Sequence, residues 1–301
     1  MIVFASSITD AAIYARAAEP GIRRAAEPDS EVIANAAAGS IFRSYNLILD
    51  TVAEREGLEA LVLLHQDAEI VSPDFCATLR AALRDPDVGV VGCVGAVGVR
   101  SIAWWEGSVT WASFTHRYEE YGGGSVPALS WTTDELPAFA QTGEVDTVDG
   151  FVLALSPWVV RNIRFDESLG RLHGYDLDFC LQVRAAGRKV ATADFKVVHH
   201  HSLDLVSNPE TWLAAHMRVA EKWDGRMPGV EAPASDWRER ARRAEAEAAL
   251  ARTEAVAAMM HAEAQSRDLV RQVDEMTNSI SWRITAPLRR LNAIRRARRA
   301  R

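Results

Sequence analysis

The sequence lacks the features that mark a secreted or membrane-spanning protein. Its three cysteines, Cys76, Cys93 and Cys180, form no Cys-x-x-Cys motif, and any disulfide scheme would leave one of them unpaired. The apolar stretch at residues 1–4 is too short for a signal peptide, and no apolar run is long enough to span a bilayer. We therefore expect buried thiols, a reducing compartment and a cytoplasmic location.

Acidic residues are absent from residues 283–301, which hold eight arginines. The whole chain has a net charge of −7, so the part before this tail carries about −15. The main part should therefore not attract nucleic acid or an anionic membrane by its bulk charge, whereas the tail could. The chain has 301 residues, 48% of them hydrophobic, which is enough for a substantial core in one large domain or two smaller ones.

Apolar strands and amphipathic helices alternate through most of the chain. We expect strands at 2–5, 31–35, 61–64, 88–97 and 189–198, and helices at 40–54, 175–186 and 209–223. This alternation predicts the α/β class, with a mostly parallel open sheet flanked by helices.

A long excursion from this pattern, residues 101–147, is rich in tryptophan. Aromatic faces can pack against sugars, and large aromatics dominate recognition surfaces. The same side chains could equally cover the edge of the core. The excursion contains Trp104, Trp105, Trp111 and Trp131.

The composition changes after Gly225. Residues 1–225 form the expected main domain, and residues 226–236 form an expected linker. Residues 237–280 contain neither glycine nor proline and should form one long helix. A coiled-coil seam with steps of 4, 3 and 4 residues predicts a possible homo-oligomer. The seam consists of Leu269, Val273, Met276 and Ile280.

Residues 281–301 form a basic tail that also contains tryptophan, isoleucine and leucine. This mixture suits an amphipathic segment at an anionic membrane surface. A solvated basic tail, or one that binds an acidic partner, remains the alternative.

The polar triplet His65-Gln66-Asp67 directly follows the apolar run 61–64. Open α/β sheets bind their ligands outside the carboxyl ends of their strands. A carboxylate there can hold a hard divalent cation that bridges two phosphates. The residues alone fit a simple strand end equally well, with Asp67 capping a turn.

Two further polar clusters have alternative interpretations. Asp176 and Asp178 lie at the start of an expected helix, where the helix dipole favours acids, but a carboxylate there could also act as a general base. In the run His199-His200-His201, the first and third side chains share one face of a strand and His200 takes the other. Imidazoles ligate metals and donate to phosphates, although an exposed polar strand end is the alternative.

The order and spacing of these segments resemble a family 2 glycosyltransferase with the GT-A fold, in the branch whose strand-exit motif reads His-Gln-Asp. The resemblance covers roughly residues 1–225. It rests on the segments 2–7, 44–46, 63–67, 89–92, 148–151, 173–180 and 200–202.

The resemblance implies roles for the matching residues. Asp67 would contact the metal and the diphosphate, and His65 stands where many relatives have Asp, which leaves the need for a metal open. Asp176 matches the catalytic base of inverting members, and His200, with either neighbour, would be a late metal ligand near the diphosphate. The nucleotide pocket would be lined by Ser6, Ser7, Asn35, Tyr45, Asn46, His65, Gln66 and Asp67. We place Trp104, Trp105, Asp149, Gly150 and Tyr175 on the acceptor side.

The activity implied is inverting transfer of a sugar from a nucleotide-sugar donor to a glycan or lipid-linked acceptor in cell-surface polysaccharide synthesis. It would use Mg²⁺ or Mn²⁺, and docking of the tail would place the protein on the inner face of the plasma membrane. Two rivals remain. A sugar nucleotidyltransferase should have a glycine-rich loop after its first strand, and residues 6–18 contain no glycine. A degenerate glycosyltransferase scaffold is kept open by His65.

Overall fold

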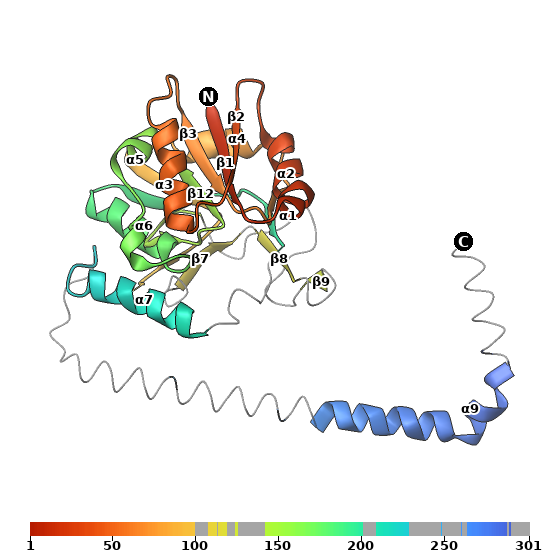
Figure 1. The fold of residues 1–301 in the computed structure, drawn as a ribbon. Helices are drawn as coiled ribbons and strands as arrows, with labels where there is room; N and C mark the ends of the chain where they lie inside the picture. Colours follow the sequence, from red (N-terminus) through yellow and green to blue (C-terminus); the bar gives the residue numbers. More distant parts are fainter. Residues whose placement is uncertain are drawn as a thin grey trace. The chain divides into compact units, whose positions relative to one another are not determined.

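The computed structural model divides the chain into two compact units, Met1–Ala232 and Pro233–Arg301, which we describe separately (Figure 1). The division falls inside the expected linker. Side chains are described for residues 1–99, 142–200, 210–228 and 264–287 and for single residues 248, 260 and 289; for 108–112, 114–118, 124–125 and 209 only the backbone is described.

A seven-stranded mixed sheet forms the centre of the first unit, in the order β10-β13-β5-β12-β3-β1-β2. β2, β1 and β3 run parallel, and β13 is parallel to β5. β12 lies antiparallel between β3 and β5, and β10 is antiparallel at the edge. The expected α/β class with a mostly parallel sheet is confirmed. The strands are β1 (Ile2–Ile8), β2 (Glu31–Ala36), β3 (Ala60–Leu64), β5 (Val88–Gly92), β10 (Glu144–Val145), β12 (Val152–Leu155) and β13 (Lys189–Thr192).

Helices cover both faces of this sheet (Figure 1). Alternate side chains of β1 show the division: Val3 packs on the side of α3, α5 and α6, whereas Phe4 packs on the side of α1, α2 and α4. Both residues are fully buried, so each face of the strand has its own core. The helices are α1 (Ala11–Arg16), α2 (Ala18–Ala25), α3 (Ile41–Val52), α4 (Phe75–Ala82), α5 (Pro157–Asn162), α6 (Tyr175–Ala185) and α7 (Pro209–Trp223), with a 3₁₀ turn at Glu167–Leu169.

Two expected strands are each broken by a bend. The segment 88–97 divides into β5 and β6 (Val94–Val97), and β6 joins a small sheet with β7 (Ser108–Ala112) and β11 (Thr147–Val148). The segment 189–198 divides into β13 and β14 (Val197–His199), with Lys196 between them at a positive φ of 50°. Buried apolar residues stand on both sides of each bend, so the sequence pattern continues through the bend.

The second bend leads the chain to the site. β14 pairs antiparallel with β4 (Ala68–Ile70), so that His199 lies opposite Ala68. β8 (Phe114–Tyr118) and β9 (Gly124–Ser125) complete this four-stranded sheet. The end of β14 is thereby placed next to the triplet that follows β3.

The second unit is helical where it is described. Residues 264–278 form one helix, and a new helix, α9 (Ile280–Ile284), begins after Ser279, whose side chain accepts a hydrogen bond from the backbone N–H of Trp282 at 3.2 Å. The expected single helix to 280 is therefore interrupted at Ser279. The seam side chains are 46–76% exposed, and pairing with a second copy stays a prediction. None of the described helices has the length and apolar character needed to cross a membrane.

Candidate active site

Three polar side chains meet where β3 and β14 end. Asp67 Oδ1 lies 3.8 Å from His65 Nδ1 and 3.5 Å from His199 Nε2. One ligand atom from each of the three residues lies within 4.8 Å of the others. Two imidazoles and a carboxylate are a donor set that fits a divalent first-row metal, so these residues could hold the expected cation.

The charge state of Asp67 suits such a ligand. Burial opposes ionisation of this carboxyl, but the imidazoles of His199 and His65 outweigh that effect and hold the pKa of Asp67 below its usual range. Asp67 is therefore a carboxylate at neutral pH, which is the form that binds a cation.

Phe151 holds both histidines in place. Its carbonyl oxygen accepts a hydrogen bond from the His65 backbone N–H at 3.0 Å, and its ring stacks on His199 with a centroid distance of 4.5 Å. Sequence reasoning gave Phe151 no role, although it belongs to the segment 148–151 that resembles the family. An aromatic residue in the middle of an apolar run is usually read as core, and Phe151 is fully buried.

His200, the expected metal ligand, lies outside the group of three. Its Nε2 lies 3.2 Å from Glu69 Oε2, and Glu69 in turn lies 3.4 Å from Arg24 Nη1 on α2. The two neighbouring histidines do take opposite faces of the strand, and the one that meets Asp67 is His199. His201 lies outside the described residues.

Asp176, the expected base, lies in the first turn of α6. Its Oδ2 accepts a hydrogen bond from the Gly150 backbone N–H at 3.1 Å, and its Oδ1 accepts one from the Leu177 N–H at 2.9 Å. Burial raises the pKa of Asp176, against the effect of these backbone donors. A carboxyl with a raised pKa is a stronger proton acceptor, as a general base requires.

Tyr175 connects Asp176 to the group formed by His65, Asp67 and His199. Its hydroxyl oxygen is 2.6 Å from His65 Nε2, and Asp176 is the next residue along α6. Gly150 packs directly against it, and a Cβ at that position would overlap the Tyr175 ring. Asp149 Oδ1 accepts a hydrogen bond from the Phe151 N–H at 3.2 Å, so the segment 149–151 is fixed next to both groups.

Asp178 points elsewhere. It is 1% exposed and accepts hydrogen bonds from Trp223 Nε1 at 2.8 Å and from Gln182 Nε2 at 2.8 Å. Lys222 Nζ lies 2.7 Å from its Oδ1. Because Lys222 and Trp223 belong to α7, Asp178 anchors α7 to α6 and takes no part in the site.

The residues expected to line the nucleotide pocket fall into two sets. Ser7 lies opposite Asn35 in the parallel β1–β2 pair, Asn35 is exposed, and the buried Ser6 Oγ makes no hydrogen bond within the described part of the chain. These three side chains lie at the carboxyl ends of β1 and β2, on the same edge of the sheet as the end of β3.

The second set has partners within the protein. Tyr45 is 1% exposed and packs on Tyr175 with a centroid distance of 5.9 Å. Asn46 accepts from the Phe165 N–H at 2.8 Å, and Gln66 Oε1 accepts from the Thr9 N–H at 2.8 Å. Trp104 and Trp105 lie outside the described residues.

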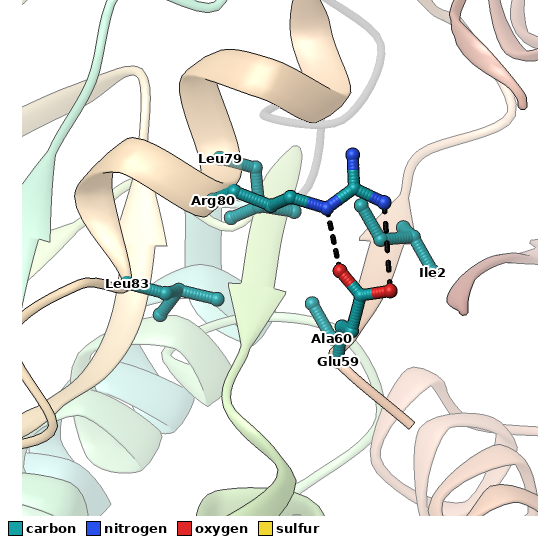
Figure 2. A pocket seen from close by; sticks show the side chains of 6 residues that line it. All are labelled: Ile2, Glu59, Ala60, Leu79, Arg80 and Leu83. Carbon is teal, nitrogen blue, oxygen red and sulfur yellow. Dashed lines mark hydrogen bonds and ion pairs between the residues drawn. The ribbon is translucent and has the colours of Figure 1, made fainter. Parts of the chain in front are cut away.

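A pocket opens at the opposite end of the strands, where β1 and β3 begin (Figure 2). Arg80 Nε donates to Glu59 Oε2 at 2.5 Å, and its two Nη atoms donate to Glu27. The bond from Arg80 is the main cause that lowers the pKa of Glu59 to about 2. Arg80 therefore pairs with both carboxylates, and the pocket contains a structural ion-pair cluster. It is lined by Ile2, Glu59, Ala60, Leu79, Arg80 and Leu83.

Two biosynthesis proteins are similar to this chain in sequence. The streptomycin biosynthesis protein StrF of Streptomyces griseus is 29% identical over 203 residues, which are 67% of this chain and 67% of that protein. The O-antigen biosynthesis protein RfbC of Myxococcus xanthus is 26% identical over 182 residues, but these are 57% of this chain and only 13% of that protein.

Solved structures of low similarity include two glycosyltransferase complexes. GalNAc-T7 with UDP, GalNAc and Mn²⁺ is 13% identical, with a TM-score of 0.47 over 75% of this chain and 48% of that chain. The mannosyltransferase PcManGT of Pyrobaculum calidifontis, in complex with GDP-Man and Mn²⁺, is 16% identical, with a TM-score of 0.46 over 75% and 65%. The sequence pattern of the glycosyltransferase-like family matches residues 4–218. The chain therefore belongs to the glycosyltransferase-like family, and it is a glycosyltransferase, as the order of its motifs predicted.

Proposed function

We propose that the protein moves a sugar from a nucleotide-sugar donor to an acceptor hydroxyl, with inversion at the anomeric carbon. The observation that carries this proposal is the position of Asp176 next to the group His65, Asp67 and His199, with Gly150 and Tyr175 between them. A proton acceptor and a cation site at one edge of the sheet are the two groups that direct displacement of a nucleoside diphosphate requires.

The donor side is formed by the metal ligands. A bound divalent cation would neutralise the charge that develops on the leaving diphosphate. Asp67 offers an ionised oxygen to the cation, and His65 and His199 each offer one ring nitrogen. Because Mg²⁺ strongly prefers oxygen ligands, two imidazoles among three side chains favour a first-row transition ion over Mg²⁺.

On the acceptor side, Asp176 takes the proton of the attacking hydroxyl. The hydroxyl oxygen forms a bond to the anomeric carbon while the bond from that carbon to the phosphate oxygen breaks, and the nucleoside diphosphate leaves. The raised pKa of Asp176 favours this proton transfer. One displacement inverts the configuration at the carbon.

A substitution of Asp176 separates chemistry from binding. Asp176→Asn should lower the rate of transfer by about 10²- to 10⁴-fold, because the amide cannot accept the proton. Nucleotide binding should survive, as measured by the thermal shift that each nucleoside diphosphate and its sugars cause with Mn²⁺ or Mg²⁺. Asp87→Asn is a matched control, since Asp87 precedes β5 at the opposite edge of the sheet and is 62% exposed. Turnover that survives Asp176→Asn would refute the role of the base.

The acceptor is proposed to be a glycan or a lipid-linked sugar. The names of the relatives refer to the biosynthesis of streptomycin and of O-antigen, which agrees with a biosynthetic transfer. We further infer that the basic tail docks on an anionic membrane at the cytoplasmic side. Ile280 and Ile284 are 76% and 72% exposed on α9, and the Arg289 guanidinium lies 3.6 Å from the centre of the Trp282 ring.

The membrane proposal has a direct test in the full chain. Replacing both Ile280 and Ile284 with Glu should abolish sedimentation with phosphatidylserine vesicles, because it removes apolar contact and adds repulsion. Binding of wild-type protein that is equal for neutral and anionic vesicles, or unchanged by the double substitution, would contradict the inference.

A further inference from the structure

Tyr175 is buried and fixed by aromatic neighbours, which acceptor recognition alone would not require. It is 6% exposed, and its ring is surrounded by Phe42, Tyr45 and Phe165 at centroid distances of 6.1, 5.9 and 6.1 Å. With the ring fixed by these neighbours, the hydroxyl has one position. That position is 2.6 Å from His65 Nε2.

The two ring nitrogens of His65 therefore face different partners. Nδ1 is the nitrogen next to Asp67, at 3.8 Å from Oδ1, and Nε2 is the one next to the Tyr175 hydroxyl. A histidine that ligates a metal through one nitrogen carries a proton on the other, and the partner of that N–H fixes the tautomer and the ring orientation. Tyr175 occupies the place of this partner.

Gly150 makes the arrangement possible and connects it to Asp176. A Cβ at position 150 would overlap the hydroxyl and ring atoms of Tyr175, so the close approach requires glycine. The Gly150 backbone N–H donates to Asp176 Oδ2 at 3.1 Å. The same backbone unit thus contacts the residue that orients His65 and holds the carboxylate of the base.

We propose that Tyr175 is a positioning residue that orients His65 as a metal ligand and couples this ligand to the first turn of α6, which carries Asp176. This inference rests on the proposed function, because it takes His65, Asp67 and His199 as the metal centre. It gives Tyr175 a role on the donor side, whereas the sequence placed it on the acceptor side.

Removal of one hydroxyl tests this role in the full chain. Tyr175→Phe keeps the ring and its packing, and it should weaken Mn²⁺ binding by about 10- to 100-fold, the usual effect of losing the partner of a ligating histidine. Tyr14→Phe is the matched control, because Tyr14 is also a buried tyrosine but lies on α1, in the core on the other face of the sheet, and it should change the affinity less than about 3-fold. Mn²⁺ affinity is measured by electron paramagnetic resonance of the free ion, with the unfolding midpoint of each variant as a check on folding.

An Asp67→Asn variant keeps the two possible failures apart. If the wild-type protein binds no Mn²⁺, or if Asp67→Asn binds it as tightly as wild type, the metal centre of the proposed function is refuted. If Asp67→Asn loses binding while Tyr175→Phe keeps wild-type affinity, the centre stands and the role of Tyr175 is refuted. Equal losses in Tyr175→Phe and Tyr14→Phe would indicate that removing any buried phenol hydroxyl weakens binding and would also refute the role of Tyr175.

Discussion

Asp178→Ala should lower the free energy of unfolding of the first unit. Asp178 lies only two residues after the proposed base, but its role is structural. Its buried carboxylate contacts Lys222 Nζ at 2.7 Å, Trp223 Nε1 at 2.8 Å and Gln182 Nε2 at 2.8 Å. Two of these partners belong to α7. The substitution therefore removes the polar anchor of α7 and leaves buried donors without an acceptor.

The expected loss follows from the partners that remain. Removing one member of a buried ion pair costs about 3–5 kcal/mol. Lys222 still has Asp166 at 2.7 Å, and its side chain is 26% exposed, so water and Asp166 compensate part of the loss. We expect about 3 kcal/mol, which in a unit of this size lowers the melting temperature by about 6–12 °C. Asp178→Asn retains the shape and one acceptor oxygen and should cost about 1–2 kcal/mol.

Urea unfolding followed by tryptophan fluorescence measures this difference, since Trp223 is itself one of the donors. Asp176→Asn is the informative comparison, because it should reduce transfer and leave the unfolding midpoint close to that of the wild type. The reasoning is refuted if Asp178→Ala lies within about 1 kcal/mol of wild type, or if Asp176→Asn is the more destabilised of the two.

Two further predictions concern the chemistry of the site. Because burial raises the pKa of Asp176, and a base works only when deprotonated, kcat/KM should fall as the pH decreases through a value above the ordinary Asp pKa of about 3.9; a profile that is flat down to pH 4 would speak against this base. Gly150→Ala should displace the Tyr175 ring and lower both Mn²⁺ affinity and the rate of transfer. Wild-type values of both quantities in the Ala variant would show that the close approach is unimportant.

The spacing of apolar residues along the sequence correctly predicted the strands and helices whose buried side chains recur at regular intervals. The run at 61–64 is β3 within one residue, and the helix expected at 209–223 is α7 with these bounds. The bends after Gly92 and at Lys196 were not predicted, because apolar residues continue on both sides of each bend. In each segment, the half before the bend pairs within the seven-stranded sheet and the half after it pairs within a smaller sheet. This choice of partner depends on residues far away in the sequence.

The candidate site was predicted in its residue types and less well in its geometry. Alternation along a strand places His199 and His200 on opposite faces, but the face that meets Asp67 depends on the pairing of His199 with Ala68 across β14 and β4. Similarly, Asp176 and Asp178 both suit a helix start. Their positions point about 200° apart around the helix. Only the packing of α7 shows that Asp178 is the one that contacts Lys222 and Trp223.

The metal centre is tested most directly by comparing the two adjacent histidines. Mn²⁺ titration of the full chain by calorimetry, with His199→Ala and His200→Ala side by side, changes the same residue type at neighbouring positions. His199→Ala should lose Mn²⁺ binding, because His199 lies 3.5 Å from Asp67, whereas His200→Ala should keep it, because His200 contacts Glu69. Loss of binding in His200→Ala with retention in His199→Ala would contradict the centre formed by His65, Asp67 and His199.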